Sequence, residues 1–318
     1  MLALDLFAGV GGLSIGFRQA GFDVVGVELS RARAAAYSQL GRAVAADVRS
    51  LDPADLPRPD VLVAGPPCRP YSRATPKERK GPNHREYGLD MEVLRFAAAI
   101  GPRVVVVEEV PGWDPSPLAS ALGGLGYDVA YRLVAFADYG VPTTRRRWVL
   151  VAARGAGAEG ALRELERLRE APPRPWDLIS DLPEAEDPSI DHVTYPINSC
   201  LREMTRYIRP GEALRDAARR GGLPPLSCVK NPANKPGYWM YRVPTDGLVK
   251  VVPHPRRSVM LHPLYGRMVT VRELARLYTF PDWYRFWAMN VDEAMRAIAD
   301  SVPPKFSHRL ASAVLGLL

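Results

Sequence analysis

The feature that most constrains this chain is the alternation of short apolar runs with helical segments over its first half. Apolar, Val-rich runs at 2–7, 23–28, 60–64 and 103–107 alternate with segments of helical periodicity. Continuous apolar strands suit a sheet that is buried on both faces, and their alternation with helices predicts the α/β class with a mostly parallel sheet. Further strands are expected at 128–135 and 147–152, and helices at 12–20, 30–40, 89–100 and 116–124.

The character of the sequence changes after residue 153. A charged helix expected at 158–170 leads into Pro172-Pro173-Arg174-Pro175, a composition typical of a boundary. From there to about residue 265 periodicity is weak and Pro, Gly and Arg are frequent, whereas regular patterns return at 271–278 and 305–318. We therefore expect a first domain over 1–180, completed by 285–318, and a smaller, irregular domain over 181–284.

The composition favours a polyanionic partner. A formal net charge of +7 and a pI near 9.4 indicate nucleic acid first. No stretch approaches the roughly 20 apolar residues of a membrane span, and no secretory leader precedes the first expected strand. The cysteines Cys68, Cys200 and Cys228 are odd in number and widely spaced. We therefore expect no disulfide framework, no metal site and a cytoplasmic location.

Cys68 follows an abrupt strand end. The run at 60–64 leads into Gly65-Pro66-Pro67-Cys68, and proline stops a strand because it has no N–H to donate. Cys68 is thus held at the carboxyl edge of the sheet, where open α/β folds bind ligands. A thiol there is a candidate nucleophile, and the alternative is a small buried side chain.

A glycine-rich turn, Phe7-Ala8-Gly9-Val10-Gly11-Gly12, follows the first expected strand. It does not satisfy the dinucleotide fingerprint, because the sixth position from Gly9 is Ser14 rather than glycine. Glu28 ends the second strand, where an acid can hold ribose hydroxyls, and Asp47 follows a shorter segment. This pattern suits a nucleoside cofactor without a pyrophosphate, such as S-adenosylmethionine, and the alternative is a plain tight turn.

Two charged pairs accompany later strands. Glu108 and Glu109 directly follow the expected strand at 103–107, where one of them can exchange a proton at the sheet edge. Arg145 and Arg147 share a face of an extended segment and suit a phosphate, a base carbonyl or the catalytic acid. The alternative for each pair is ordinary surface charge.

Seven motifs occur in order: Asp5-Leu6-Phe7-Ala8-Gly9-Val10-Gly11-Gly12, Gly65-Pro66-Pro67-Cys68, Glu108-x-Val110, Arg145-x-Arg147, Arg267-x-x-Thr270-Val271-Arg272-Glu273, Phe280-Pro281-Asp282 and Val302-Pro303-Pro304. Their combination resembles the family of DNA cytosine-C5 methyltransferases, over nearly the whole chain outside about 185–255. The resemblance implies a Rossmann-like S-adenosylmethionine-dependent methyltransferase fold, and a smaller irregular domain for target recognition.

The resemblance also implies roles for individual residues. Cys68 would attack C6 of a cytosine swung out of the duplex, and Glu108 would bind and protonate N3. Arg145 and Arg147 would support the nucleophile and the base carbonyl. The cofactor pocket would be lined by Phe7, Gly9, Gly11, Gly12, Glu28, Asp47, Val48, Pro67, Leu89 and Ser301.

By the same resemblance, the variable stretch at 185–265 would read the DNA sequence. Arginine can bind guanine edges, and aromatic rings can wedge into the base stack. An alternative for the aromatic residues is a small core. The candidates are Arg202, Arg206, Arg209, Arg215, Arg219 and Arg220, with Tyr195, Tyr207, Tyr238, Trp239 and Tyr241.

The chain departs from the family pattern at several positions. Glu109 stands where the family has Asn, Thr143 and Arg69 stand where it has Gln, and Ala299-Asp300-Ser301 replaces a terminal Gly-Asn-Ala. These changes leave the nucleophile, the acid, the arginine pair and the glycine turn in place.

We therefore expect an enzyme, a DNA (cytosine-5-)-methyltransferase of the restriction-modification kind. It would act as a monomer on double-stranded DNA, with S-adenosylmethionine as the donor and S-adenosylhomocysteine as the product. One alternative is a tRNA cytosine-C5 methyltransferase, although the Cys-Phe-Thr insertion usual before Phe280-Pro281 is absent. Another is a catalytically inactive DNA-binding homologue, against which the intact catalytic residues argue.

Overall fold

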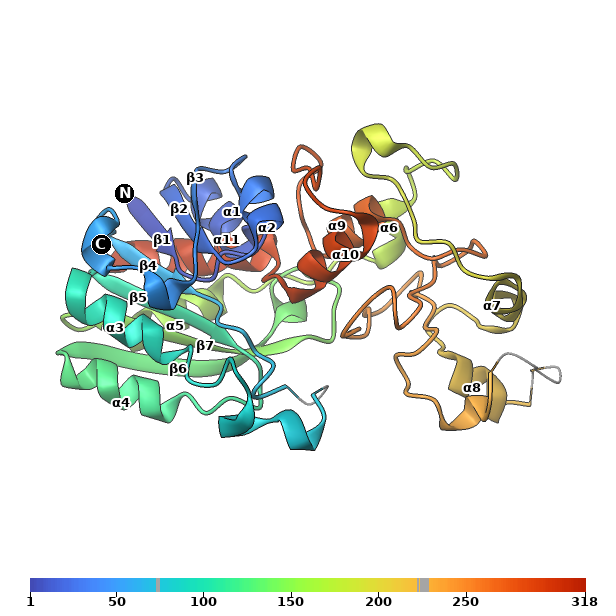
Figure 1. The fold of residues 1–318 in the computed structure, drawn as a ribbon, viewed down its shortest axis with the longest axis horizontal. Coiled ribbons are helices and arrows are strands. Elements are labelled where there is room, and N and C mark those ends of the chain that lie inside the picture. Colours follow the sequence, from blue (N-terminus) through green and yellow to red (C-terminus); the bar gives the residue numbers. More distant parts are fainter. Residues whose placement is uncertain (73–74, 222, 224–228) are drawn as a thin grey trace. The chain divides into compact units, whose positions relative to one another are not determined.

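The computed structural model describes residues 1–72, 75–221, 223 and 229–318. The chain divides into two compact units, which are described here one at a time (Figure 1). Unit 1 comprises Met1–Gly140, Arg146–Ala171 and Ser301–Leu318, and unit 2 comprises Val141–Arg145 and Pro172–Asp300.

Unit 1 is built on a seven-stranded sheet with the order β3-β2-β1-β4-β5-β7-β6. The first five strands pair in parallel, and β7 runs antiparallel to both β5 and β6. The predicted mostly parallel α/β sheet is confirmed. The strands are β1 (Leu2–Asp5), β2 (Asp23–Glu28), β3 (Arg42–Ala45), β4 (Val61–Ala64), β5 (Val104–Glu109), β6 (Tyr127–Ala135) and β7 (Arg146–Arg154).

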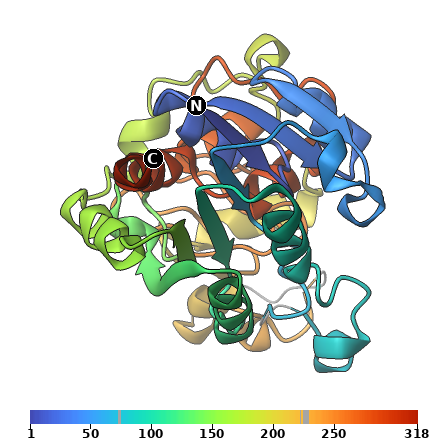
Figure 2. The ribbon, with the colours of Figure 1, turned by 90° about the vertical axis from the view of Figure 1, so that its left-hand side faces the viewer.

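Helices cover both faces of this sheet (Figures 1 and 2). Helix α11 returns from the end of the chain to pack on α1 and α5, while α3 packs on α4. Because both faces are covered, every residue of β4 and β5 is buried, as their continuous apolar sequences require. The helices of unit 1 are α1 (Gly12–Gln19), α2 (Arg31–Tyr37), α3 (Met91–Ile100), α4 (Ser116–Gly124), α5 (Ala158–Arg167) and α11 (Pro304–Val314).

Two element boundaries beside the candidate site and one whole strand differ from the sequence prediction. The first strand ends at Asp5 instead of residue 7, because the glycine turn begins there. The short strand β3 had not been predicted. Strand β5 continues through Glu108 and Glu109, so these acids lie within the strand and not after it.

Unit 2 has helices but no named strand among its described residues, where only isolated bridges such as Arg242–Leu261 occur. Its helices are short, and regular structure had been expected only for the one at Val271–Leu277. They are α6 (Pro175–Ile179), α7 (Ser199–Met204), α8 (Leu214–Arg219), α9 (Val271–Leu277) and α10 (Val291–Asp300).

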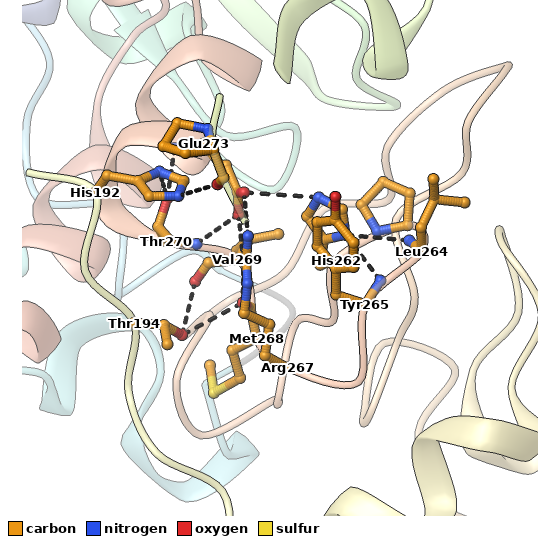
Figure 3. Close-up of polar contacts among 12 residues, drawn as sticks. His192, Thr194, His262, Leu264, Tyr265, Arg267, Met268, Val269, Thr270 and Glu273 are labelled. Carbon is orange, nitrogen blue, oxygen red and sulfur yellow. Dashed lines mark hydrogen bonds and ion pairs between the residues drawn. The ribbon is translucent and has the colours of Figure 1, made fainter. Parts of the chain in front are cut away.

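Buried polar side chains join the irregular segments of unit 2 (Figure 3). The Glu273 carboxylate accepts two hydrogen bonds from Arg267, at 2.8 and 2.9 Å, and one from the backbone N–H of Thr270. His262 Nε2 lies 3.6 Å from Glu273 Oε1, and Thr270 Oγ1 lies 3.0 Å from Nδ1 of His192. Segments that are distant in the sequence therefore meet around the start of α9.

The cysteines require one correction. Cys200 is disulfide-bonded, whereas Cys68 is a free cysteine. An odd number of cysteines is no evidence against pairing, because two of three cysteines can form a disulfide. Cys228 lies outside the described residues.

Two general findings concern membranes and metals. No helix in the described part of the chain has the length and apolar character needed to cross a membrane. The same residues contain no group of three or more His, Cys, Asp or Glu side chains arranged to hold a metal ion.

Candidate active site

The glycine turn between β1 and α1 requires its glycines. Gly9 and Gly11 have φ of +56° and +81°, which side chains with a Cβ rarely adopt. A Cβ on Gly12 would lie 2.1 Å from the carbonyl oxygen of Val302 and 3.0 Å from Cβ of Ser301. A Cβ on Gly9 would meet nothing within 4 Å. The turn thus packs on the start of the returning segment at Gly12 and is open at Gly9.

The two predicted cofactor-binding acids differ in their partners. Glu28 accepts the backbone N–H of Gly9 through Oε2 and that of Ser30 through Oε1, both at 2.8 Å. Its carboxylate therefore lies directly at the open glycine of the turn. Asp47 instead binds the Arg49 guanidinium, whose hydrogen bonds lower the pKa of the Asp47 carboxyl.

The remaining predicted pocket residues belong to unit 1, and three of them, Phe7, Val48 and Leu89, share one hydrophobic cluster. Val48 is buried. Phe7 and Leu89 are half-buried and pack against the hydrophobic core, and Pro67 and Ser301 are half-buried.

A polar chain that sequence reasoning missed lies beneath the glycine turn. Ser14 donates to Asp5 Oδ2 at 2.8 Å, and the Tyr37 hydroxyl donates to Ser14 Oγ at 2.8 Å. Burial raises the pKa of Asp5 from an ordinary 3.8 to about 7, and the charge of Glu28 adds a smaller increase. The signal available in the sequence was an acid at the end of a fully apolar strand.

Cys68 opens a tight turn after β4. The backbone N–H groups of Tyr71 and Ser72 donate to the Cys68 carbonyl oxygen at 3.0 and 2.9 Å. The thiol belongs to a half-buried residue. The backbone that carries the thiol is therefore fixed on both sides, by the two prolines before it and by the turn after it.

Glu108 and Arg147 form an ion pair beside this segment. Arg147 Nε lies 2.9 Å from Glu108 Oε1, and their side chains are only 12% and 7% exposed. A Cβ on Gly65 would lie 3.6 Å from Glu108 Oε2. The segment that leads to Cys68 thus passes alongside the carboxyl group, which is paired with the half-buried guanidinium of Arg147 on β7.

Glu109 has a different environment. Successive strand residues point to opposite faces of a sheet, so Glu109 points away from the side on which Glu108 meets Arg147. Its Oε2 accepts the backbone N–H of Val110. Burial raises the pKa of Glu109 well above the ordinary range, and the neighbouring Glu108 contributes to the increase. The arginine partner therefore distinguishes Glu108 from Glu109.

Arg145 belongs to unit 2, whereas Arg147 belongs to unit 1. The Arg145 side chain is buried and donates to the carbonyl oxygens of Ala299 and Asp300 at 2.8 and 3.2 Å. The two arginines of this motif thus have separate partners, one a carboxylate and the other the end of α10.

The residues predicted for target recognition divide by exposure. Tyr241 is fully buried, with the Lys250 ammonium 4.9 Å from the centre of its ring. Arg215 and three of the aromatic side chains are half-buried. The exposed members are Arg202, Arg206, Arg209, Arg219, Arg220 and Tyr238.

Comparison with solved structures identifies the fold. The fold matches that of a protein (E. coli) described as a prophage-encoded DNA modification methyltransferase, with a TM-score of 0.75 and 20% identity over 100% of this chain and 99% of that chain. It also matches the S. pombe Dnmt2 methyltransferase, with a TM-score of 0.63 and 18% identity over 100% of this chain and 99% of the other. The fold is that of methyltransferases.

The chain belongs to the C-5 cytosine-specific DNA methylase family, whose model matches residues 1–316. It is 28% identical to the type II methyltransferase M.AplI of Arthrospira platensis, over 99% of this chain and 85% of that protein. It is 29% identical to M.XorII of Xanthomonas oryzae pv. oryzae, over 100% of this chain and 85% of that protein. The predicted family, fold class and enzyme class, DNA (cytosine-5-)-methyltransferase, are confirmed.

Proposed function

We propose that this enzyme transfers a methyl group from S-adenosylmethionine to C5 of a cytosine within a specific sequence of double-stranded DNA, through a covalent bond between Cys68 and C6. The observation that carries the proposal is the ion pair of Glu108 with Arg147 beside the segment that ends in Cys68. Cys68 follows β4, and Glu108 lies near the carboxyl end of the neighbouring parallel strand β5, at the edge where such sheets bind ligands.

The residues of the glycine turn fit a nucleoside cofactor with a sulfonium charge. Gly9 has a positive φ and open space where a Cβ would be, so a ligand can approach the backbone closely. The Glu28 carboxylate lies at this point and retains lone pairs for ribose hydroxyls. The negative charge of Glu28 beside the turn also suits the positive charge of a sulfonium group.

The chemistry follows from the weak nucleophilicity of cytosine C5. The Cys68 thiolate forms a bond to C6 while Glu108 gives a proton to N3, so that the electrons of the C5–C6 double bond make C5 an enamine carbon. When bound, S-adenosylmethionine supplies the electrophilic methyl group that C5 takes. Loss of the C5 proton to a base then restores the double bond, expels the Cys68 thiolate and returns the N3 proton to Glu108.

Arg147 has two proposed roles in this reaction. Its guanidinium holds the Glu108 carboxyl on one side of β5 through an ion pair. As part of the arginine pair it would also favour the thiolate, the reactive form of Cys68, over the thiol.

The substrate base must leave the duplex before the thiol can reach C6, so base flipping forms part of the proposal. The exposed arginines of unit 2 supply a sequence-independent attraction to phosphates. We assign target recognition to unit 2 and catalysis with cofactor binding to unit 1, and we expect a monomer.

The test is replacement of the nucleophile. We expect Cys68→Ser to abolish methyl transfer from labelled cofactor to duplex DNA and to leave DNA affinity within about threefold of the wild type. Trapping on duplex DNA that carries 5-fluorocytosine should give a covalent complex with the wild type and none with Cys68→Ser. Retained turnover in Cys68→Ser would overturn the assignment.

A parallel reaction with tRNA as acceptor distinguishes the substrate. Labelling of tRNA without labelling of DNA would replace the proposed substrate while keeping the catalytic residues. No labelling of either acceptor by the wild type would favour an inactive DNA-binding homologue.

A further inference from the structure

Asp90 lies immediately before α3, at the position where an aspartate usually caps the helix. Its side chain makes no capping hydrogen bond to α3. Instead, Oδ1 accepts the Tyr71 hydroxyl at 3.1 Å and Oδ2 accepts the Trp113 indole N–H at 2.9 Å. The carboxylate is therefore directed to two side chains from other segments of unit 1.

Both partners belong to segments that carry catalytic residues. Tyr71 lies in the turn after β4, where its backbone N–H donates to the carbonyl oxygen of Cys68. Trp113 lies in the turn after β5, where its backbone N–H donates to the carbonyl oxygen of Val110 at 3.0 Å. One carboxylate thus connects the turn of the nucleophile with the turn that follows the acid, Glu108.

The backbones of the two turns also touch each other. A Cβ on Gly112 would lie 2.3 Å from the carbonyl oxygen of Tyr71, so only glycine allows the observed approach. Trp113 is 3% exposed and packs into the hydrophobic core of the sheet. The core holds Trp113 in place. Through its hydrogen bonds to both side chains, Asp90 therefore restrains Tyr71, and with it the turn that begins at Cys68.

The position of a carboxylate here needs an explanation beyond packing. Asp90 is 8% exposed, and both of its partners are neutral donors. Burial of a charge opposite neutral partners costs more free energy than an apolar side chain of similar size would. Hydrogen bonds are directional, however, whereas apolar contacts only fill space. Burial and the Asp90 charge together raise the pKa of the Tyr71 hydroxyl, which keeps it protonated as a donor.

We propose that Asp90 is a positioning residue for methyl transfer, which sets the Cys68 turn relative to Glu108 through its hydrogen bonds to Tyr71 and Trp113. This inference rests on the proposed function of Cys68 and Glu108. We call Tyr71, Asp90 and Trp113 the clamp. Small displacements of reacting groups reduce rates strongly, so the loss of one hydrogen bond in the clamp should slow formation of the bond between Cys68 and C6. DNA and cofactor binding should change little, because the Asp90 carboxylate binds Tyr71 and Trp113, which are not among the residues predicted to bind either ligand.

The experiment measures covalent-complex formation in single turnover. The recognition sequence is first mapped by bisulfite sequencing of treated plasmid DNA, and a duplex with 5-fluorocytosine at the target is then prepared. Asp90→Asn retains one acceptor and loses the other, with nearly the same shape. We expect its complex to form about tenfold more slowly but to reach the wild-type amount per enzyme, with unchanged KM for DNA and unchanged cofactor affinity by calorimetry.

The final amount of complex distinguishes positioning from simple loss of folded protein. A purely structural effect would lower the amount per enzyme and leave the rate constant at the wild-type value, and this outcome overturns the proposal. A wild-type rate and amount in Asp90→Asn would also overturn it. Absence of any complex with the wild type would instead refute the role of Cys68.

Matched variants sharpen the result. Tyr71→Phe removes only the donor to Oδ1, and Trp113→Phe removes only the donor to Oδ2. We expect each to slow the step, and Tyr71→Phe to have no further effect once Asp90 is replaced by Leu.

Asp128→Asn is the control, because Asp128 also accepts two hydrogen bonds in unit 1, from the backbone of Gly157 and Ala158. We expect the wild-type rate from Asp128→Asn, and additive effects of Tyr71→Phe and Asp90→Leu would contradict the clamp.

Discussion

The two units satisfy their backbone polar groups in different ways. In unit 1 the strands of the sheet pair with one another, and apolar side chains fill both faces. Unit 2 has no named strand among its described residues, so its carbonyl groups need other donors. Arginine side chains supply them, because each guanidinium offers five N–H groups.

Arg242 is the strongest example in unit 2. Its side chain is buried and donates from Nε and both Nη atoms, so that one residue joins three segments of the chain. Arg272 acts similarly around Asp191 and the segment after α9. The acceptors of Arg242 are the carbonyl oxygens of Thr205, Ile208, His262, Pro263 and Tyr265. A buried arginine can therefore bind the backbone carbonyl groups of irregular segments, as strand pairing does in a sheet.

The largest effect is expected when this arginine is removed. Arg242→Met keeps much of the volume but leaves several buried carbonyl groups without a donor, which should cost about 3–5 kcal/mol. We expect peptides of unit 2 to lose protection in hydrogen exchange, while β4 and β5 keep theirs.

The control for this variant is Arg206→Met, which removes a 75% exposed arginine paired with Glu203. Its cost should stay below about 0.5 kcal/mol. Equal effects of the two substitutions, or equal loss of protection in both units, would contradict the comparison.

The second prediction concerns pH, to which the units should respond in opposite directions. In unit 1 burial raises the pKa of Asp5 to about 7, so between about pH 4 and 7 the native state binds more protons than the unfolded state. Its stability therefore falls as pH rises through this window. In unit 2 burial lowers the pKa of His262 from 6.5 to about 4, so there the unfolded state binds more protons and stability rises with pH.

The carboxyl of Glu273 extends the response of unit 2 to lower pH, below about pH 5. Burial by itself would raise its pKa, but the hydrogen bonds and charge of Arg267 outweigh burial and lower it. Between pH 5 and 7 each unit should change by roughly 2 kcal/mol, in opposite senses. Hydrogen exchange in denaturant, corrected for the pH dependence of the intrinsic exchange rates, measures the free energy of unfolding of each unit. Asp5→Asn should reduce the response of unit 1, to which Glu109 adds in the same direction because burial also raises its pKa. His262→Asn should reduce the response of unit 2, and shifts of the same sign in both units would refute the prediction.

The same contrast explains what the sequence could predict. The strands of unit 1 were recognisable because burial on both faces requires uninterrupted apolar runs, as in β4 and β5. Their order placed Cys68 and Glu108 at adjacent strand ends. Strand β3 was missed because it lies at the sheet edge and its sequence, Arg-Ala-Val-Ala, is short and partly polar.

The organisation of unit 2 could not be predicted in the same way. Its structure depends on side chains that bind carbonyl groups far away in the sequence, as when Arg242 reaches Ile208 and Tyr265. No local periodicity distinguishes such a buried arginine from the exposed arginines that are expected to bind DNA, because all are the same residue type. In the candidate site, Asp90 was missed for a related reason, because an aspartate before a helix predicts a cap and not a clamp.

The smallest effect should come from the helix caps, which offer a matched pair. Thr270 caps α9 by accepting the N–H of Glu273 at 3.0 Å, and its hydroxyl also meets His192. Ser30 caps α2 with a longer contact of 3.4 Å to Arg33. Thr270→Ala should cost about 1–2 kcal/mol and Ser30→Ala about 0.5 kcal/mol, measured by urea denaturation. Helix α2 also packs beside the sheet, whereas α9 begins within a polar network. Equal losses of unfolding free energy in the two variants would mean that the capping hydrogen bond alone, and not the surrounding network, stabilises the start of α9.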